Sequence, residues 1–386
     1  MIKRSLALAL AALLIMSALS AASAESLTEP YVEHAFAVRN VKGGVAMVAR
    51  NGETVFSYAY GSRDARGKQP MTTDTCFRIA SVTKLVTAVG LMTLYDAGAF
   101  ALDQDICELL PFRVVNTAYP NDPLTPRQLM SHTTGLNATT HPQANWEYLS
   151  LKDSSPMFKR GVRPGARYLY SNANGGMFGA LIEALSGQSV NAYMQERVFA
   201  PLEINAAYNA GLLPDQSAVA AVLSQGGTTI DSIEEQIASL AEYDDTCDPA
   251  NHLTVTAGSL LISAEGMLKI GNLLLNGGEL NGTRLLREDT VAIMEADQNA
   301  FSGSSVTGES PYGLSLQRVT DSHGNTWYGH QGMRNGLSSD LFYQPDLGLT
   351  VAVIANGYKP LKLGSLASIA SIIMDRAAET EWESPQ

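Results

Sequence analysis

The sequence predicts an α+β fold, in which one antiparallel sheet is built from both chain ends and flanked by helices, with a mostly helical lobe inserted between them. Apolar and polar residues alternate, as in strands, at 44–59 and again from 312 to 355. Between 81 and 300 the apolar residues recur with the period of helices, interrupted by loops that contain Gly and Pro. We therefore expect one domain, residues 25–386, made of a sheet lobe (about 25–80 and 305–386) and a helical lobe (about 81–304).

Residues 1–24 have the features of a secretory signal peptide. Lys3-Arg4 precede an apolar run, and Ala22-Ser23-Ala24 forms a small-residue cleavage site. The run is too short for a spanning helix, and no cysteine follows it closely enough to suggest a lipid anchor. We expect cleavage before Glu25 and an exported protein, periplasmic or secreted, without a stable membrane anchor.

The composition bears on partners and chemistry. A net charge of −12 at pH 7 disfavours nucleic-acid binding. Three cysteines (Cys76, Cys107 and Cys247) permit at most one internal disulfide, and the sequence leaves the pairing open. The six histidines are scattered, and no P-loop, His-Glu-x-x-His or Gly-x-Ser-x-Gly motif occurs. We expect no metal and no cofactor.

The first elements are a short helix at 30–38 and a hairpin. Two strand patterns, 44–49 and 54–59, flank the turn Arg50-Asn51-Gly52-Glu53, which is a hairpin signal.

The next element carries chemistry. Ser81 stands where an extended segment gives way to an apolar-periodic one, so it is expected at a helix N-terminus, and the helix should end at Gly98. Lys84 lies three residues on and shares the same helix face, so its ammonium can lie against the serine hydroxyl. Alone, this pair also fits an N-cap serine followed by a solvated lysine. It is, however, the only Ser-x-x-Lys in the sequence.

A second motif lies in the loop before the helix pattern of 176–187. Tyr170 and Asn172 are two residues apart and could serve packing and capping. Near a serine and a lysine they become a phenolic proton acceptor and an amide that can hold the lysine or a substrate carbonyl. Upstream, Thr125-Pro126 is a good helix start.

A third motif lies among the last strands. His330 and Gly332 belong to a strand pattern; a lone histidine in a strand is more often a core residue than a catalytic one. Gly332 permits close approach of the backbone, and the strand edge could offer a main-chain N–H to an oxyanion. The expected strands are 312–319, 326–330, 337–343 and 349–355, with a turn at 345–348 and a closing helix at 361–378.

In this order, the three motifs resemble the serine β-lactamase and penicillin-binding-protein superfamily. The resemblance is greatest to its branch of class C β-lactamases, D-alanyl-D-alanine carboxypeptidases, D-aminopeptidases and related esterases. It also covers Leu124 to Leu136, Ala257 to Leu260 and the final strands to Gly357. It implies a β-lactamase/transpeptidase-like fold and a structural role for His132.

The resemblance also implies roles for the motif residues. Ser81 is the acylated nucleophile, and Lys84 and Tyr170 shuttle its proton. The N–H groups of Ser81 and Met333 form an oxyanion hole, and Asn172 lines the site.

The third motif departs from the pattern of this superfamily. Most β-lactam-handling relatives have Lys-Thr-Gly where this chain has His330-Gln331-Gly332. A permanent cation is thus replaced by an imidazole that is partly charged near neutrality, and Arg334 is a candidate for the missing charge. The expected substrate-binding residues are Asn172, His330, Gly332, Met333 and Arg334.

These expectations describe an exported serine hydrolase that forms an acyl-enzyme with a small-molecule or peptide substrate. A D-amino-acid or peptidoglycan-type peptide, or a small ester, is favoured over a β-lactam because of the third motif. The alternatives are a class C-like β-lactamase and a catalytically silent protein that binds cell-wall peptides. Retention of Ser81, Lys84 and Tyr170 argues against the silent protein. The loop from Asp231 to His252 is expected to border the site, and the oligomeric state is open.

Overall fold

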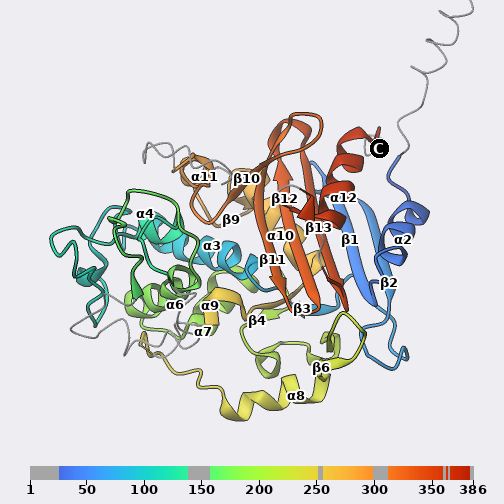
Figure 1. Cartoon of the computed structure of the whole chain (residues 1–386), viewed down its shortest axis with the longest axis horizontal. Coiled ribbons are helices and arrows are strands. Elements are labelled where there is room, and N and C mark those ends of the chain that lie inside the picture. The colour runs from blue at the N-terminus through green and yellow to red at the C-terminus, as the bar shows by residue number, and fades with distance from the viewer. Residues whose placement is uncertain are drawn as a thin grey trace, which may run out of the picture.

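The computed structural model describes residues 26–137, 157–250, 255–298, 312–359, 362–363 and 366–382 (Figure 1). The predicted signal peptide (1–24) and the end of the loop predicted to border the site (251–252) lie outside these ranges. Among the described residues, no helix combines the length and the apolar character that a membrane crossing needs.

A six-stranded antiparallel sheet joins the two ends of the chain, which confirms the predicted fold class. Figure 1 shows the blue N-terminal strands beside the red C-terminal ones. The order is β10-β11-β12-β13-β1-β2, and β1 pairs with β13 from Gly43–Asn356 to Arg50–Leu349. The strands are β1 (Gly43–Arg50), β2 (Glu53–Gly61), β10 (Gln317–Thr320), β11 (Thr326–Arg334), β12 (Leu337–Gln344) and β13 (Leu349–Asn356).

Helices cover both faces of this sheet. On the outer face, α2 (Glu29–Ala37) and α12 (Ser368–Glu379) enclose an apolar cluster that includes Val353 and Phe342. On the inner face, α10 (Ala264–Leu275) packs against β1, β12 and β13. Although α10 lies in the segment predicted for the helical lobe, its apolar residues complete the core of the sheet.

The central helix is α3 (Val82–Asp96). Twelve of its residues are buried, which is typical of a helix enclosed on all sides. It packs against β11, α6 (Asn172–Ser186) and α9 (Val255–Gly258). The structure thereby brings the three sequence motifs to one end of α3. The remaining helices are α4 (Pro126–Met130), α7 (Val190–Met194, continued by a π-turn to Phe199), α8 (Ile233–Ala238) and α11 (Glu288–Glu295).

Short strands interrupt the lobe that the sequence predicts as mostly helical. A three-stranded sheet has the order β3-β7-β4, and two hairpins, β5–β6 and β8–β9, lie apart from it. These strands have two or three residues each, too few for their alternation to stand out in the sequence. They are β3 (Cys76–Arg78), β4 (Ala206–Ala207), β5 (Val222–Leu223), β6 (Thr229–Asp231), β7 (Leu261–Ser263), β8 (Glu279–Leu280) and β9 (Thr283–Arg284).

Two boundaries differ from the predicted ones by five residues or more. The expected strand 312–319 is paired as a strand only from Gln317, because Gly313 and Leu314 bond to other partners and Tyr312 turns inward as a buried side chain. The closing helix begins at Ser368 rather than 361, because β14 (Lys362–Leu363) and β15 (Leu366–Ala367) form a short ladder before it.

Candidate active site

Ser81 occupies the turn between β3 and α3. Ile79 is fixed to the small sheet by its N–H, which donates to the carbonyl of Leu260 at 2.9 Å. Ala80 then adopts a φ of +47°, a costly conformation for a residue with a Cβ, and the chain turns into the helix. Ser81 is the N-cap residue, but its side chain makes no capping hydrogen bond. Its hydroxyl is therefore available to groups outside the helix backbone.

Lys84 reaches this hydroxyl from one turn further along α3. Its Nζ lies 3.1 Å from Ser81 Oγ, 3.0 Å from Asn172 Oδ1 and 2.6 Å from the carbonyl oxygen of Ala257. The side chain is completely buried, and Gly175 leaves room for it, since a Cβ there would lie 2.6 Å from Lys84 Cε. Burial lowers the pKa of Lys84 from 10.5 to about 7. A substantial fraction is thus the neutral amine at neutral pH, able to accept a proton.

Tyr170 lies beside the same pair. The Lys84 ammonium is 5.1 Å from the centre of its ring, within the range of a cation–π contact. Burial raises the pKa of Tyr170 to about 12, although hydrogen bonding to Ser81 partly opposes this shift. The Tyr170 hydroxyl lies near Ser81, but within the described part of the chain it makes no hydrogen bond with good distance and angle. At neutral pH Tyr170 is therefore a neutral phenol, and its expected role in shuttling the serine proton together with Lys84 stays a prediction.

His132, which lies in the segment Leu124 to Leu136 that carries part of the family resemblance, packs against Tyr170. His132 is buried, and its ring centre lies 4.3 Å from that of Tyr170. Its Nδ1 accepts from Asn174 Nδ2 at 3.0 Å and from the N–H of Ser171 at 3.3 Å, so the proton of the neutral ring is on Nε2. Burial and the charge of Lys84 lower the pKa of His132, which keeps the ring neutral. These contacts fit the structural role implied by the resemblance.

Strand β11 lies directly against the backbone of the nucleophile. A Cβ on Gly332 would come 2.3 Å from the carbonyl of Ile79 and 3.0 Å from the N of Ser81, so only glycine permits this approach. Ser339 of β12 fixes the same contact by donating to the Ile79 carbonyl at 2.6 Å. Met333 follows Gly332 and is 38% exposed. The oxyanion hole formed by the N–H groups of Ser81 and Met333 stays a prediction.

His330 differs from its expected state. It is buried, with Nδ1 2.6 Å from the carbonyl oxygen of Gln331 and Nε2 2.9 Å from the hydroxyl of Tyr312. A carbonyl only accepts, so Nδ1 carries the proton and the Tyr312 hydroxyl donates to Nε2. Burial and the charge of Lys84 lower the pKa of His330 to about 3. The expectation of a partly charged imidazole is therefore wrong; whether the neutral ring contacts substrate stays a prediction.

Arg334 is also placed differently from the sequence interpretation. Its Nη2 lies 3.6 Å from Oδ2 of Asp231 in β6, and both side chains are partly exposed. His330 and Arg334 lie on opposite sides of Gly332, each about 6–7 Å from it along the strand. Whether Arg334 supplies to substrate the charge that is missing at His330 stays a prediction.

Asn172 opens α6 with its side chain partly in solvent, and its Oδ1 binds Lys84 as predicted for a site residue. Sequence reasoning missed other participants: the carbonyl of Ala257, the hydroxyl of Tyr312, and Arg78 near Arg334. A carbonyl acceptor leaves no signature in a sequence. Arg78 could have been noticed as a cation within three residues of the nucleophile.

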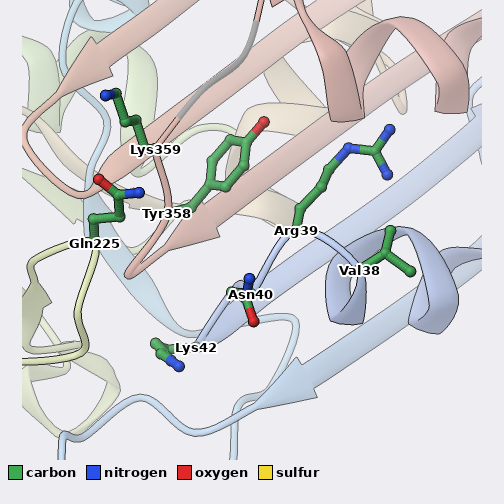
Figure 2. Close-up of a pocket in the computed structure, with 7 residues that line it drawn as sticks. All are labelled: Val38, Arg39, Asn40, Lys42, Gln225, Tyr358 and Lys359. Carbon is green, nitrogen blue, oxygen red and sulfur yellow. The ribbon is translucent and has the colours of Figure 1, made fainter.

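Other features lie apart from these residues. The three cysteines are free thiols, so the disulfide left open by the sequence does not form here. A pocket of about 400 Å³ is lined by Arg39, Lys42, Lys359 and four uncharged residues, and Figure 2 shows the charged ends of these three pointing away from one another. None of its lining residues belongs to the Ser81 site.

A serine, a lysine and a tyrosine gathered at one end of a buried helix, on an α+β fold, define the class of protein as the β-lactamase and penicillin-binding-protein type. The family model for Beta-lactamase matches residues 28–370, and the chain belongs to this family.

Relatives extend the comparison. Esterase EstB of Burkholderia gladioli is 32% identical over 204 residues, which cover 48% of this chain and 51% of EstB. Penicillin-binding protein 4 of Amycolatopsis lactamdurans is 26% identical over 299 residues, 74% of each chain. The chain thus matches about half the length of EstB and about three quarters of the second relative.

Solved structures share the fold. The D-amino acid amidase of Ochrobactrum anthropi SV3 superposes with a TM-score of 0.67 at 22% identity, over 91% of this chain and 97% of the amidase. A penicillin-binding protein homologue from Pyrococcus abyssi, an octamer, has a TM-score of 0.67 at 20% identity over 90% of this chain and 75% of that one. These two likenesses show that the chain has the fold of these proteins.

Proposed function

We propose that the protein hydrolyses an ester or amide through an acyl-enzyme on Ser81. The observation that carries this proposal is the contact between Lys84 Nζ and Ser81 Oγ, at 3.1 Å, made by a lysine that is buried without a carboxylate partner within the described structure. Burying an amine in this way is costly, and such perturbed groups cluster at functional sites. A silent binding protein gains nothing from it.

The steps follow from the positions of three side chains. Ser81 Oγ attacks the carbonyl carbon of the substrate, and its proton passes to the neutral amine of Lys84. The tetrahedral oxyanion is held by main-chain N–H groups beside Gly332. The Tyr170 hydroxyl protonates the leaving oxygen or nitrogen and recovers its proton from Lys84. Water then attacks the acyl-enzyme with the same groups acting in reverse.

We further propose a small ester or a D-amino-acid or peptidoglycan-type peptide as the substrate, after export directed by residues 1–24. The names of the relatives support an ester or a peptide, since they include an esterase and penicillin-binding proteins. The neutral, buried His330 argues against efficient β-lactamase activity, because it offers no cation to a carboxylate where Lys-Thr-Gly relatives have a lysine.

A fluorescent fluorophosphonate probe tests the mechanism. Wild type should be labelled on a denaturing gel and should hydrolyse p-nitrophenyl esters, whereas Ser81→Ala should do neither. Ser217→Ala, which removes an exposed serine in another loop, is the matched control and should behave as wild type. Ester hydrolysis that survives in Ser81→Ala would refute the proposal, and so would a wild type that neither reacts with the probe nor turns over any ester or peptide.

A further inference from the structure

A cluster of three charges lies near the nucleophile and takes no part in the proposed chemistry. Arg78 comes from β3, Asp231 from β6 and Arg334 from β11. Asp231 and Arg334 form an ion pair at 3.6 Å, with side chains 38% and 28% exposed. Arg78 is partly buried, and its Nε has no hydrogen-bond partner among the residues that the structure describes. Asp231 thus pairs with Arg334, and it is the carboxylate whose charge acts on Arg78.

The charges of Arg334 and Asp231 both act on the pKa of Arg78. Burial lowers the pKa of Arg78, the charge of Arg334 lowers it further, and Asp231 raises it. Guanidinium groups keep their charge in proteins, so the cluster carries one uncompensated positive charge. It is open to solvent through Arg334 and Asp231.

Strand β11 fixes where this charge lies relative to the reacting bond. His330, Gly332 and Arg334 alternate onto one face of the strand, because side chains two residues apart point to the same side. Gly332 is the member that abuts the backbone of Ser81. His330 and Arg334 therefore flank the nucleophile, one on each side.

The proton donor shows which side receives the leaving group. The ring of Tyr170 lies 6.2 Å from that of His330, centre to centre, and no contact joins Tyr170 to Arg334 in the described structure. Under the proposed function, a leaving oxygen or nitrogen that needs a proton takes it from Tyr170, so the leaving group must lie within reach of this hydroxyl. The leaving group thus lies on the side of His330, which is neutral, and the acyl group extends toward Arg334.

We propose that Arg334 and Arg78 form a subsite for an anionic group, such as a carboxylate, carried by the acyl half of the substrate. Asp231 tunes this subsite by compensating one of its two positive charges. This inference rests on the proposed function and specifies the substrate class: an acid on the acyl side and an uncharged leaving group. A guanidinium binds a carboxylate through paired charge-assisted hydrogen bonds, which explains why arginines suit this place.

Three esters test the inference: p-nitrophenyl hexanoate (uncharged), mono-p-nitrophenyl adipate (carboxylate on the acyl half) and 4-carboxyphenyl hexanoate (carboxylate on the leaving group). We expect Arg334→Ala to lower kcat/KM for the adipate about tenfold, the loss typical of one charge-assisted contact, and to change the uncharged hexanoate less than about twofold. Arg334→Lys should recover part of the loss. Asp231→Asn should raise the preference for the adipate over the hexanoate.

Arg284→Ala is the matched control, because Arg284 is an ion-paired arginine of the β8–β9 hairpin. It should leave all three rates unchanged. Arg78→Gln tests the second arginine in the same assays. Because Arg78 is partly buried, this variant could fail to fold; in that case the Arg334 and Asp231 variants alone decide the question.

The inference is overturned if Arg334→Ala changes the adipate and the hexanoate equally, if Asp231→Asn lowers the preference for the adipate, or if the loss falls on the 4-carboxyphenyl ester instead. Such results would leave the proposed function intact, because Ser81-dependent hydrolysis of the uncharged hexanoate is a separate readout. Absence of that hydrolysis in wild type would instead refute the proposed function.

Discussion

Lys84 combines a position fixed by sequence with a protonation state fixed by the fold. Its place three residues after Ser81 is read directly from the chain, but its pKa is set by burial among α3, α6 and the Ala257 carbonyl. The same environment acts in the opposite direction on Tyr170, because burial favours the neutral form of either group. The site thus holds an amine and a phenol that are both able to be neutral at pH 7.

The pH dependence of turnover should report Lys84. The amine must be neutral to accept the serine proton, so kcat/KM for an uncharged ester should fall as the pH drops below about 7, the pKa of Lys84. With its pKa at about 3, His330 does not titrate in this range and cannot produce the same limb. Stopped-rate assays from pH 5 to 9 on wild type and Lys84→Arg should show the limb only in wild type. A retained rate with the same acid limb in Lys84→Arg would contradict this assignment.

Tyr170→Phe should separate substrates by leaving group. Loss of a positioned general acid typically costs about 10²–10⁴-fold in rate. An amide needs its nitrogen protonated and should suffer the full loss, whereas p-nitrophenolate leaves without a proton and should be affected much less. Comparing kcat/KM for a D-amino-acid p-nitroanilide and a p-nitrophenyl ester measures this difference, with Tyr168→Phe as the control. Equal losses on both substrates would show that Tyr170 does not protonate the leaving group.

At the scale of elements, β11 and β12 form one wall of the site. Some features of this wall can be predicted from the sequence and others cannot. The strands and the close approach at Gly332 follow from sequence, since alternation and a glycine at the contact are local signals. The burial of His330 does not, because it depends on Tyr312, eighteen residues away, turning inward. The pairing of Arg334 with Asp231 likewise depends on β6, a three-residue strand without a sequence signature. Contacts between short elements that are far apart in the chain are therefore the features of the site that could not be predicted from the sequence.

Strand β12 also contains an unusual buried acid. Asp340 is 2% exposed, neither of its carboxyl oxygens has a hydrogen-bond partner in the described part of the chain, and burial raises its pKa well above the usual value. It lies on the same face as Phe342, within the layer that α2 and α12 cover.

Asp340→Asn should therefore stabilise the protein as the pH rises. A carboxyl whose folded pKa is raised contributes its full stability below its unfolded pKa and loses stability at higher pH, because ionisation is suppressed only in the folded state. Relative to wild type, the variant should gain about 1.4 kcal/mol for each pH unit above the unfolded pKa of about 3.9 over which the folded carboxyl stays protonated, and the gain should vanish toward pH 4. Thermal unfolding from pH 4 to 9 measures it. Asp346→Asn, in the exposed turn after β12, is the control; a pH-independent difference would contradict the assignment.

At the scale of the whole molecule, the two lobes share one core. The apolar cluster that contains α3 and α10 continues into residues of β1, β12 and β13, among them Val45, Leu341 and Ile354. The sequence predicted the sheet and the inserted helices, but it assigned α10 to the helical lobe because the boundary was drawn from periodicity alone. Packing, not chain order, decides to which layer a helix belongs.

A fragment of residues 81–298 should consequently not fold by itself. Removing the sheet strands would expose the apolar faces of α10 and α3, and no other described element could cover them. Circular dichroism of this fragment should show no cooperative thermal transition, whereas residues 25–386 should unfold in one step with coincident loss of ester hydrolysis. A fragment with its own sharp transition would show that the lobes are independent.

The pairing of β1 with β13 also determines when, during synthesis of the chain, the sheet can be completed. β13 is the second partner of β1, beside β2, and is synthesised about 300 residues after it. At about 5–20 residues per second, this edge of β1 therefore stays unpaired for roughly 15–60 s. Gly332 and Ser339, which contact the backbone at Ser81, are likewise synthesised about 250 residues after it. Under the proposed function, a ribosome that has completed Ser81 and Lys84 has therefore not yet made a competent site, and the nascent chain stays inactive until β11 and β12 have emerged.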